Sequence, residues 1–220
     1  MTTTTAQRAR VCVLVSGNGS NLQAMIDACA RGSVAADIVQ VISNRPDAFG
    51  LVRAQNAGIP TAILDHKNFP DRAGFDTALA DLIGQSQPHW VILAGFMRIL
   101  TPEFVQRFLG KLINIHPSLL PKYPGLNTHA RALEAGDVQH GATVHFVTPT
   151  VDAGPVIIQG VLTIQPHESL GSLKARVHRL EHQIYPVALA ALVAGDVKFE
   201  DARAVWADGA SNDSPRQMHT

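Results

Sequence analysis

Short runs of β-branched residues alternate along the first half of the chain with longer segments of helical periodicity, and this alternation limits the possible fold most strongly. The pattern is typical of βαβ units, in which helices cover both faces of a mostly parallel sheet. We expect strands at 11–15, 38–43, 61–64, 90–94 and 111–115, and helices at 22–30, 48–56, 72–85 and 102–108. The first half is therefore expected to form an α/β, doubly wound sheet.

The second half has a different pattern. Residues 141–148 and 155–164 alternate as strands do, on either side of a turn at 149–154, so we expect them to extend the sheet as antiparallel strands. The remaining expected elements are a long helix at 170–193 and a hairpin of strands at 197–199 and 202–206. We find no repeat and no linker, and expect one domain at 11–206 between disordered tails at 1–10 and 207–220.

Composition and charge exclude several classes of protein. Lysine plus arginine equals aspartate plus glutamate at 18 each, so no basic field attracts nucleic acid or an anionic membrane. No apolar run reaches the roughly 20 residues of a membrane span, and the first ten residues lack the apolar stretch of a signal peptide. We expect a cytoplasmic protein in which Cys12 and Cys29 are free thiols.

An amide and an imidazole stand two positions apart where one apolar run ends. In an extended strand, Asn114 and His116 point to the same side and would face one pocket. A carboxamide beside a titratable ring suits the stabilisation of an oxyanion and the movement of a proton, which is the chemistry of acyl transfer. The same pair can also simply terminate a strand, so the pattern alone leaves both interpretations open.

A glycine-rich turn, residues 16–21 (SGNGSN), joins the first expected strand to the first helix. Gly17 and Gly19 allow the backbone to bend, and the free amides of Gly19, Ser20 and Asn21 would face an anion such as a phosphate. The turn lacks the lysine of a Walker sequence and the third glycine of a dinucleotide fingerprint. This loop and the end of the fifth strand both lie at the carboxyl edge of the sheet, where α/β proteins bind ligands.

Five motifs together resemble the phosphoribosylglycinamide formyltransferases of purine biosynthesis. They are residues 16–23 (SGNGSNLQ), 93–100 (LAGFMRIL), 114–125 (NIHPSLLPKYPG), 145–147 (HFV) and 151–157 (VDAGPVI). The likeness runs from about residue 11 to 206, and it implies a single-domain formyltransferase fold. Enzymes that use 10-formyltetrahydrofolate share the asparagine-histidine-proline element, whereas the glycine loop points to the glycinamide ribonucleotide enzyme.

The resemblance implies two substrate sites, with 10-formyltetrahydrofolate as co-substrate, no metal, and a monomer or weak homodimer. Gly19, Ser20 and Asn21 would hold the phosphate of glycinamide ribonucleotide, and Glu181 its ribose hydroxyls. The folate would lie in a cleft lined by Met97, Arg98, Ile99 and Leu100, with Arg72 reaching towards its anionic end.

The resemblance also places Asn114, His116 and Asp152 at the reacting centre. The substrate amine would attack the formyl carbon directly, and Asn114 with protonated His116 would stabilise the oxyanion. Asp152 would favour the protonated imidazole and fix its orientation. Because the amine attacks directly, we expect no acyl-enzyme and a structural role for Ser118.

Several alternatives remain at this stage. Methionyl-tRNA formyltransferase would need a further basic domain, deformylase would need a regulatory domain before the first strand, and a binding module would not need Asn114, His116 and Asp152 together. His145 could be structural or could orient the site. The likeness further implies a cis bond at Leu120-Pro121.

Other positions depart from the pattern or imitate a different one. His178 stands where relatives carry glutamine or lysine, and Ala153 where a second glycine is common, so we expect an ordinary negative φ for Ala153. His178 and His182, with Glu181, match an inverted zinc-protease pattern, but the sequence supplies no suitable third ligand, so we reject a metal site there.

Overall fold

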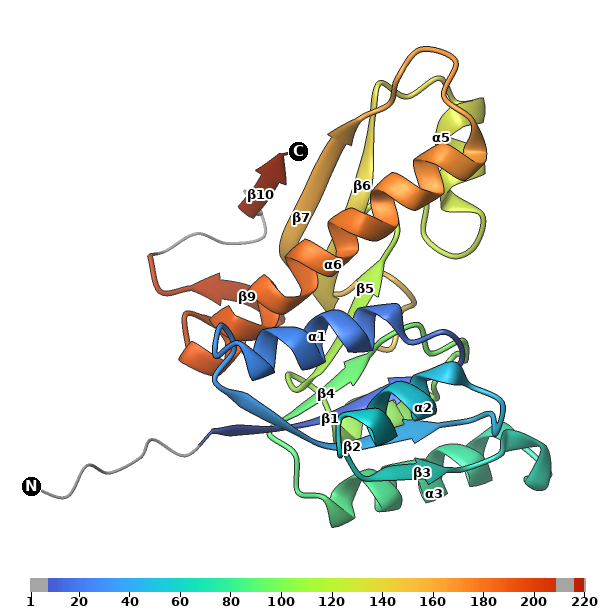
Figure 1. The fold of residues 1–220 in the computed structure, drawn as a ribbon, viewed down its shortest axis with the longest axis vertical. Helices are drawn as coiled ribbons and strands as arrows, with labels where there is room; N and C mark the ends of the chain where they lie inside the picture. The colour runs from blue at the N-terminus through green and yellow to red at the C-terminus, as the bar shows by residue number, and fades with distance from the viewer. Residues whose placement is uncertain (1–7, 209–215, 220) are drawn as a thin grey trace, which may run out of the picture.

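A computed structural model describes residues 8–208 and 216–219. Its centre is an eight-stranded sheet in the order β10-β7-β6-β5-β4-β1-β2-β3, and a separate two-stranded hairpin, β8-β9, lies beside it. Helices cover both faces of the large sheet (Figure 1). The predicted α/β fold class is confirmed.

The first five strands are all parallel to one another. They are β1 (Ala9–Val15), β2 (Ala36–Ser43), β3 (Thr61–Ile63), β4 (Trp90–Leu93) and β5 (Leu112–His116). Alternate residues of β1 belong to different halves of the core: Val11 and Val13 pack on one face, and Cys12 and Leu14 on the other. This strand is buried on both faces, which explains why its sequence is a continuous apolar run rather than an alternating one.

The second half adds antiparallel strands, as predicted. β6 (Gln139–Phe146) pairs antiparallel with β5, and β7 (Val156–Thr163) pairs antiparallel with β6. The hairpin consists of β8 (Val197–Glu200) and β9 (Arg203–Trp206). Because Phe146 pairs with Ile113, the turn at 149–154 follows β6 beside the first residues of β5, and Asp152 of this turn reaches His116.

The predicted tails need one correction. Residues 1–7, 209–215 and 220 lie outside the described part of the chain, whereas Ala9 and Arg10 already belong to β1. Arg216–His219 form β10, which pairs in parallel with the outer edge of β7, so the prediction of disorder was wrong for this segment. This four-residue segment is polar and shows no apolar alternation that would predict a strand. It forms one because the outer edge of β7 offers free backbone groups for pairing.

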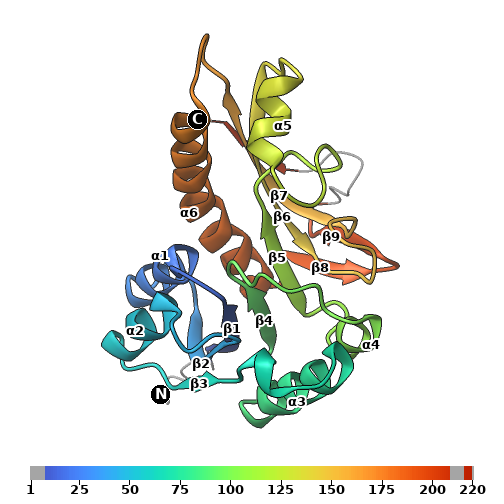
Figure 2. The ribbon, with the colours of Figure 1, turned by 90° about the vertical axis from the view of Figure 1, so that its right-hand side faces the viewer.

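Two layers of helices enclose the sheet (Figure 2). α1 (Ser20–Ala30), α2 (Phe49–Asn56) and α6 (Leu170–Ala194) lie on one face, and α3 (Arg72–Gln85) and α4 (Pro102–Arg107) on the other. Within the described residues, no helix is long and apolar enough to cross a membrane.

Capping residues explain where these helices begin and end. The side chains of Asp71 and Thr101 accept the Gly74 and Phe104 amides at the starts of α3 and α4. Ser169 caps α6 in the same way, and Gly195, with φ of 79°, ends it. Two short elements had not been predicted: η1 (His66–Asn68) and α5 (Thr128–Glu134). Both are too short to show a helical apolar period.

Candidate active site

The loops that leave the carboxyl ends of β1, β4 and β5 meet on one side of the sheet. The turn after β1 leads into α1, the segment after β4 contains Arg98, and β5 ends at His116. Ser16 links the first two loops, because its hydroxyl donates to Asn44 Oδ1 at 2.6 Å and accepts the Met97 amide at 2.8 Å. This buried contact was not predicted from the sequence, since the three residues are far apart along the chain.

The turn before α1 depends on close backbone packing. Gly19 has φ of 72°, and a Cβ atom built there would lie 2.5 Å from the Cα of Gly50. The Gly50 amide in turn donates to the Gly17 carbonyl at 3.0 Å. Because α1 starts at Ser20, the amides of its first turn point out of the helix and form a site for an anion.

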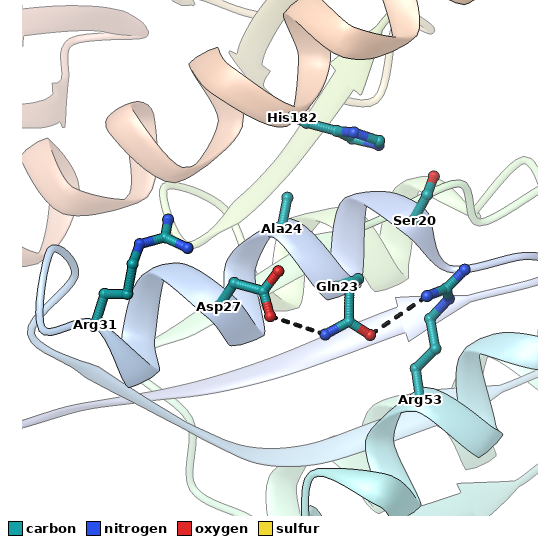
Figure 3. A pocket seen from close by; sticks show the side chains of 7 residues that line it. All are labelled: Ser20, Gln23, Ala24, Asp27, Arg31, Arg53 and His182. Carbon is teal, nitrogen blue, oxygen red and sulfur yellow. Dashed lines mark hydrogen bonds between the residues drawn. The ribbon is translucent and has the colours of Figure 1, made fainter.

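Arg53 of α2 fixes the same turn from the side. Its guanidinium donates to the carbonyl of Asn18 at 2.8 Å, to Asn18 Oδ1 at 3.0 Å and to Gln23 Oε1 at 3.3 Å. Arg53 also lines a cavity of about 390 Å³ along α1, together with Ser20, Gln23, Ala24, Asp27, Arg31 and His182 (Figure 3). The sequence analysis missed Arg53, because its contacts depend on how α2 packs against α1.

α6 brings two further predicted residues against the turn. His178 Nε2 lies 2.6 Å from Ser20 Oγ, and Glu181 Oε2 accepts from Asn21 Nδ2 at 2.8 Å. Burial lowers the pKa of His178, and burial raises the pKa of Glu181 to about 7. The Oδ1 atom of Asn21 is buried and has no hydrogen-bond partner in the part of the chain that the structure describes. This corner therefore combines helix amides with a buried carboxyl group and a free acceptor.

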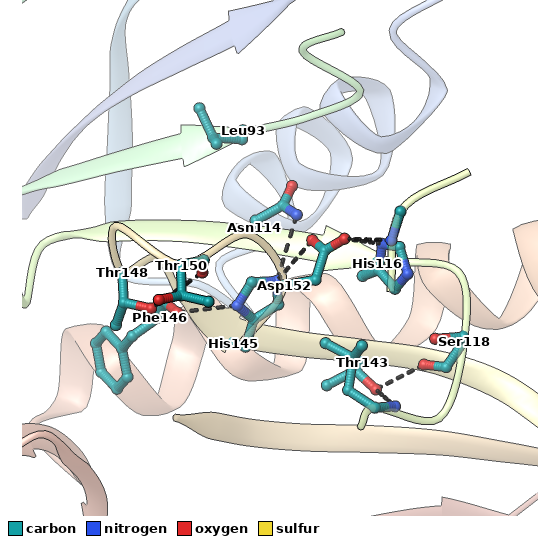
Figure 4. A network of polar contacts seen from close by, with 12 residues as sticks. Leu93, Asn114, His116, Ser118, Thr143, His145, Phe146, Thr148, Thr150 and Asp152 are labelled. Carbon is teal, nitrogen blue, oxygen red and sulfur yellow. Dashed lines mark hydrogen bonds and ion pairs between the residues drawn. The ribbon is translucent and has the colours of Figure 1, made fainter. Parts of the chain in front are cut away.

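Asn114, His116 and Asp152 converge at the end of β5 (Figure 4). His116 Nδ1 lies 3.4 Å from Asp152 Oδ2, and both side chains are nearly buried. Asp152 has φ of 52°, a left-handed conformation that aspartate tolerates better than most residues, whereas Ala153 keeps a negative φ, as expected. The Gly125 amide donates to Asp152 Oδ2 at 2.8 Å and joins the loop after β5 to this turn.

Both ring nitrogens of His116 face groups that only accept hydrogen bonds. Nε2 lies 2.8 Å from the carbonyl oxygen of Tyr123, and Nδ1 faces the Asp152 carboxylate. A ring that carries protons on both nitrogens satisfies both acceptors at once. The two acceptors thus fix the orientation of the His116 ring.

His145 also belongs to this centre. Its Nε2 atom lies 3.3 Å from Asn114 Nδ2 and 3.9 Å from Asp152 Oδ1. Burial lowers the pKa of this histidine. The sequence left its role open, and the structure places it in contact with the polar centre.

A narrow cleft of about 150 Å³ joins the polar centre to the segment after β4. Asn114, His145 and Asp152 contribute its polar groups, and the predicted residues Arg98, Ile99 and Leu100 also line it. The other lining residues are Leu93, Phe96, Val105, Val147, Thr148, Pro149 and Val151. Most of these neighbours are apolar. The cleft thus places apolar side chains next to the polar groups of Asn114 and Asp152.

The other two residues predicted for this cleft do not line it. Met97 is 72% exposed and Arg72 is exposed at the start of α3, and neither lines the cleft. Arg98 stacks its guanidinium 4.6 Å from the ring centre of Phe75, one turn along α3 from Arg72. The structure therefore brings Arg98, Ile99 and Leu100 to the cleft, but not Met97 or Arg72.

The hydroxyl of Ser118, in the loop after β5, has a structural role and is not activated as a nucleophile. Ser118 is fully buried and its Oγ donates to the Lys122 carbonyl at 2.6 Å, so it has no base to activate it. The Leu120-Pro121 bond is cis. Across the described residues, no group of three or more histidine, cysteine, aspartate or glutamate side chains is placed to bind a metal ion.

Comparisons with known proteins agree with this geometry. A family profile described as formyl transferase matches residues 9–189. The phosphoribosylglycinamide formyltransferase of Haemophilus influenzae is 48% identical over 192 residues, covering 87% of this chain and 91% of that protein. The Escherichia coli enzyme of the same name is 49% identical over 199 residues, covering 90% of this chain and 93% of that protein.

A solved structure gives the same result for the fold. The phosphoribosylglycinamide formyltransferase of Coxiella burnetii superposes with a TM-score of 0.91 at 48% identity, covering 96% of this chain and 99% of that one. The sequence matches and the superposed fold identify the same family. The chain belongs to the formyl transferase family, and within it to the phosphoribosylglycinamide formyltransferases.

Proposed function

We propose that the chain transfers the formyl group of 10-formyltetrahydrofolate to the amine of glycinamide ribonucleotide by direct attack at the Asn114, His116 and Asp152 centre. The observation that carries this proposal is that Asn114 and Asp152 line the apolar cleft, while His116 faces Asp152 Oδ2 from behind at 3.4 Å. The folate would occupy that cleft, with its formyl group at Asn114. Met97 and Arg72 are exposed and do not line the cleft, so they would contact only parts of the folate that extend out of it.

The ribonucleotide would lie at the neighbouring corner. The amides of Gly19, Ser20 and Asn21 at the start of α1 would bind its phosphate. Glu181 and the unpartnered Oδ1 of Asn21 are both acceptors, and ribose hydroxyls are suitable donors for them. Tyr185, one turn after Glu181, places its hydroxyl 3.1 Å from the carbonyl oxygen of Ile113, the residue before Asn114. α6 thus connects the two sites.

In the proposed reaction, the amine nitrogen forms a bond to the formyl carbon and the carbonyl oxygen becomes an oxyanion. Asn114 and the His116 imidazolium stabilise this oxyanion, and Asp152 holds the imidazolium in place. The bond from carbon to the folate nitrogen then breaks, and that nitrogen gains the proton that the amine loses. Asp152 lies close enough to the centre to accept this proton and pass it on through water.

The cheapest test is spectrophotometric. We expect tetrahydrofolate to appear when the protein is mixed with 10-formyltetrahydrofolate and glycinamide ribonucleotide together, and not with the folate alone. Release of tetrahydrofolate without the ribonucleotide would instead indicate a deformylase. No release under either condition would indicate a binding module, and transfer to methionyl-tRNA would indicate the tRNA enzyme.

A second measurement tests the phosphate corner. Inorganic phosphate should raise the KM for the ribonucleotide competitively and leave the KM for the folate unchanged. An unchanged ribonucleotide KM at high phosphate would remove the role assigned to Gly19, Ser20 and Asn21. A monomeric or weakly dimeric state and a location in the cytoplasm stay predictions from the sequence.

A further inference from the structure

His145 lies directly opposite Asn114 in the antiparallel pairing of β6 with β5. It is 1% exposed, and the register between β6 and β7 shifts between Val144 and His145. Such irregularities occur next to active sites, where they change the direction of a side chain. The ring therefore lies in the sheet interior at the end that carries the polar centre.

Hydrogen bonding determines which nitrogen of His145 carries a proton. Nδ1 lies 2.9 Å from the carbonyl oxygen of Phe146, which can only accept, so Nδ1 is the donor. Burial lowers the pKa of the ring, which is therefore neutral at pH 7. A neutral ring protonated at Nδ1 presents a lone pair at Nε2.

That lone pair determines the orientation of the Asn114 amide. Nε2 faces Asn114 Nδ2 at 3.3 Å, and an amide oxygen at this place would oppose one lone pair with another (Figure 4). The nitrogen of the amide is thus held on the side of Asp152 and His116. Because an amide nitrogen has two hydrogens, one is bound by His145 and the other stays free for a substrate oxygen.

The same tautomer preserves the charge of Asp152 for His116. Asp152 Oδ1 lies 3.9 Å from Nε2 of His145, which carries no proton to donate. Asp152 Oδ2 lies closer to His116, at 3.4 Å from Nδ1. A neutral His145 therefore does not compete with His116 for the carboxylate.

We propose that His145 is a positioning residue, whose bare Nε2 atom turns the amide nitrogen of Asn114 towards the formyl oxygen. This inference rests on the proposed function, since it assigns the free amide hydrogen of Asn114 to the oxyanion. His145 itself does not transfer a proton.

The test compares two substitutions of His145 that differ in the acceptor. His145→Leu removes the acceptor and keeps a buried apolar side chain, whereas the Oε1 atom of His145→Gln can occupy about the place of Nε2. Loss of a whole oxyanion donor costs about 10² to 10³ in rate, so a misoriented donor should cost His145→Leu about 10- to 10²-fold in kcat. Both KM values should change less than about threefold, and His145→Gln should recover most of kcat.

A double-mutant cycle separates positioning from a structural effect. In the Asn114→Ala background, His145→Leu should change kcat by less than about twofold, because the group that it positions is gone. The ¹⁵N spectrum of the wild-type His145 ring at pH 7 should show a protonated Nδ1 and a bare Nε2.

Four results would each overturn the proposal. They are wild-type turnover in His145→Leu, equal losses in His145→Leu and His145→Gln, an undiminished loss in the Asn114→Ala background, and a proton on Nε2. If Asn114→Ala is slow while His145→Leu turns over at the wild-type rate, only this inference fails. If Asn114→Ala keeps wild-type turnover, the proposed function fails as well.

Discussion

The corner proposed for the ribonucleotide and the proposed reacting centre are built in opposite ways. The corner uses backbone amides of three consecutive residues at the start of α1, and its shape depends on the missing side chain of Gly19. The centre uses side chains of Asn114, His116 and Asp152, which lie on a strand end and in a distant turn. The first site comes from consecutive residues and would be disturbed by any added side-chain volume. The second comes from residues far apart in the sequence and would be disturbed by a change of functional group. Substitutions should therefore damage the two sites differently.

The largest effect is expected at the reacting centre. Asn114→Ala should fold normally and lose about 10² to 10³ in kcat, because one preorganised oxyanion donor is removed. The KM for the ribonucleotide should stay within about threefold, since the corner is untouched. Steady-state kinetics and thermal unfolding measure both quantities. Asn56→Ala, in an exposed position on α2, is the matched control. A near-normal kcat in Asn114→Ala would remove its assigned role.

At the corner, the corresponding change should damage the fold itself. Gly19→Ala places a methyl group 2.5 Å from the Gly50 backbone at a φ of 72°. We expect a loss of about 2 to 4 kcal/mol in the free energy of unfolding, from overpacking and the left-handed backbone, with weaker ribonucleotide binding. Gly17→Ala is the control, because a Cβ atom there meets nothing within 4 Å. Urea unfolding measures the free energy of unfolding of both variants. Equal values for Gly19→Ala and Gly17→Ala would show that the corner does not depend on the missing side chain of Gly19.

Glu181, a titrating side chain of the corner, gives a smaller and pH-dependent effect. The pKa of Glu181 is raised by burial from 4.5 to about 7, so between these values the folded chain keeps a proton that the unfolded chain has lost. Stability due to this group is present below about pH 4.5 and is lost as the pH rises through about 7.

Glu181→Gln removes that dependence. Between about pH 5 and about pH 8 the variant should gain stability relative to wild type, by on the order of 3 kcal/mol at most. Asn21 keeps an oxygen acceptor in glutamine, so the packing of the corner is preserved. The measurement is the free energy of unfolding across this pH range. Parallel curves for the two proteins would show that Glu181 does not titrate as described.

The same contrast explains what the sequence predicts. α3 was predicted at its observed bounds, since Asp71 caps its start and the buried residues Phe75, Leu79 and Ile83 recur every four positions. The turn before α1 was recognised from its glycines, because a helix start is a local feature. β10 was missed, since Arg216–His219 form a strand only because the edge of β7 is free to pair.

The reacting centre required more than local patterns. The spacing of Asn114 and His116 predicts a shared side of a strand, but Asp152 joins them only through the packing of the turn after β6. The role of Asp152 therefore came from the family resemblance. The contacts of Ser16, Arg53 and His145 depend on strand register and helix packing, and no spacing in the sequence indicates them.

The most direct test of the central claim is the kcat of Asp152→Asn at saturating concentrations of both substrates. Asparagine tolerates the φ of 52° at this position and keeps the volume, but it removes the negative charge that lies 3.4 Å from Nδ1 of His116. Asp201→Asn, in an exposed turn with φ of 48°, is the matched control. The account predicts a kcat at least about 10²-fold below wild type, with both KM values within about threefold and normal thermal stability. A kcat within about threefold of wild type would contradict it.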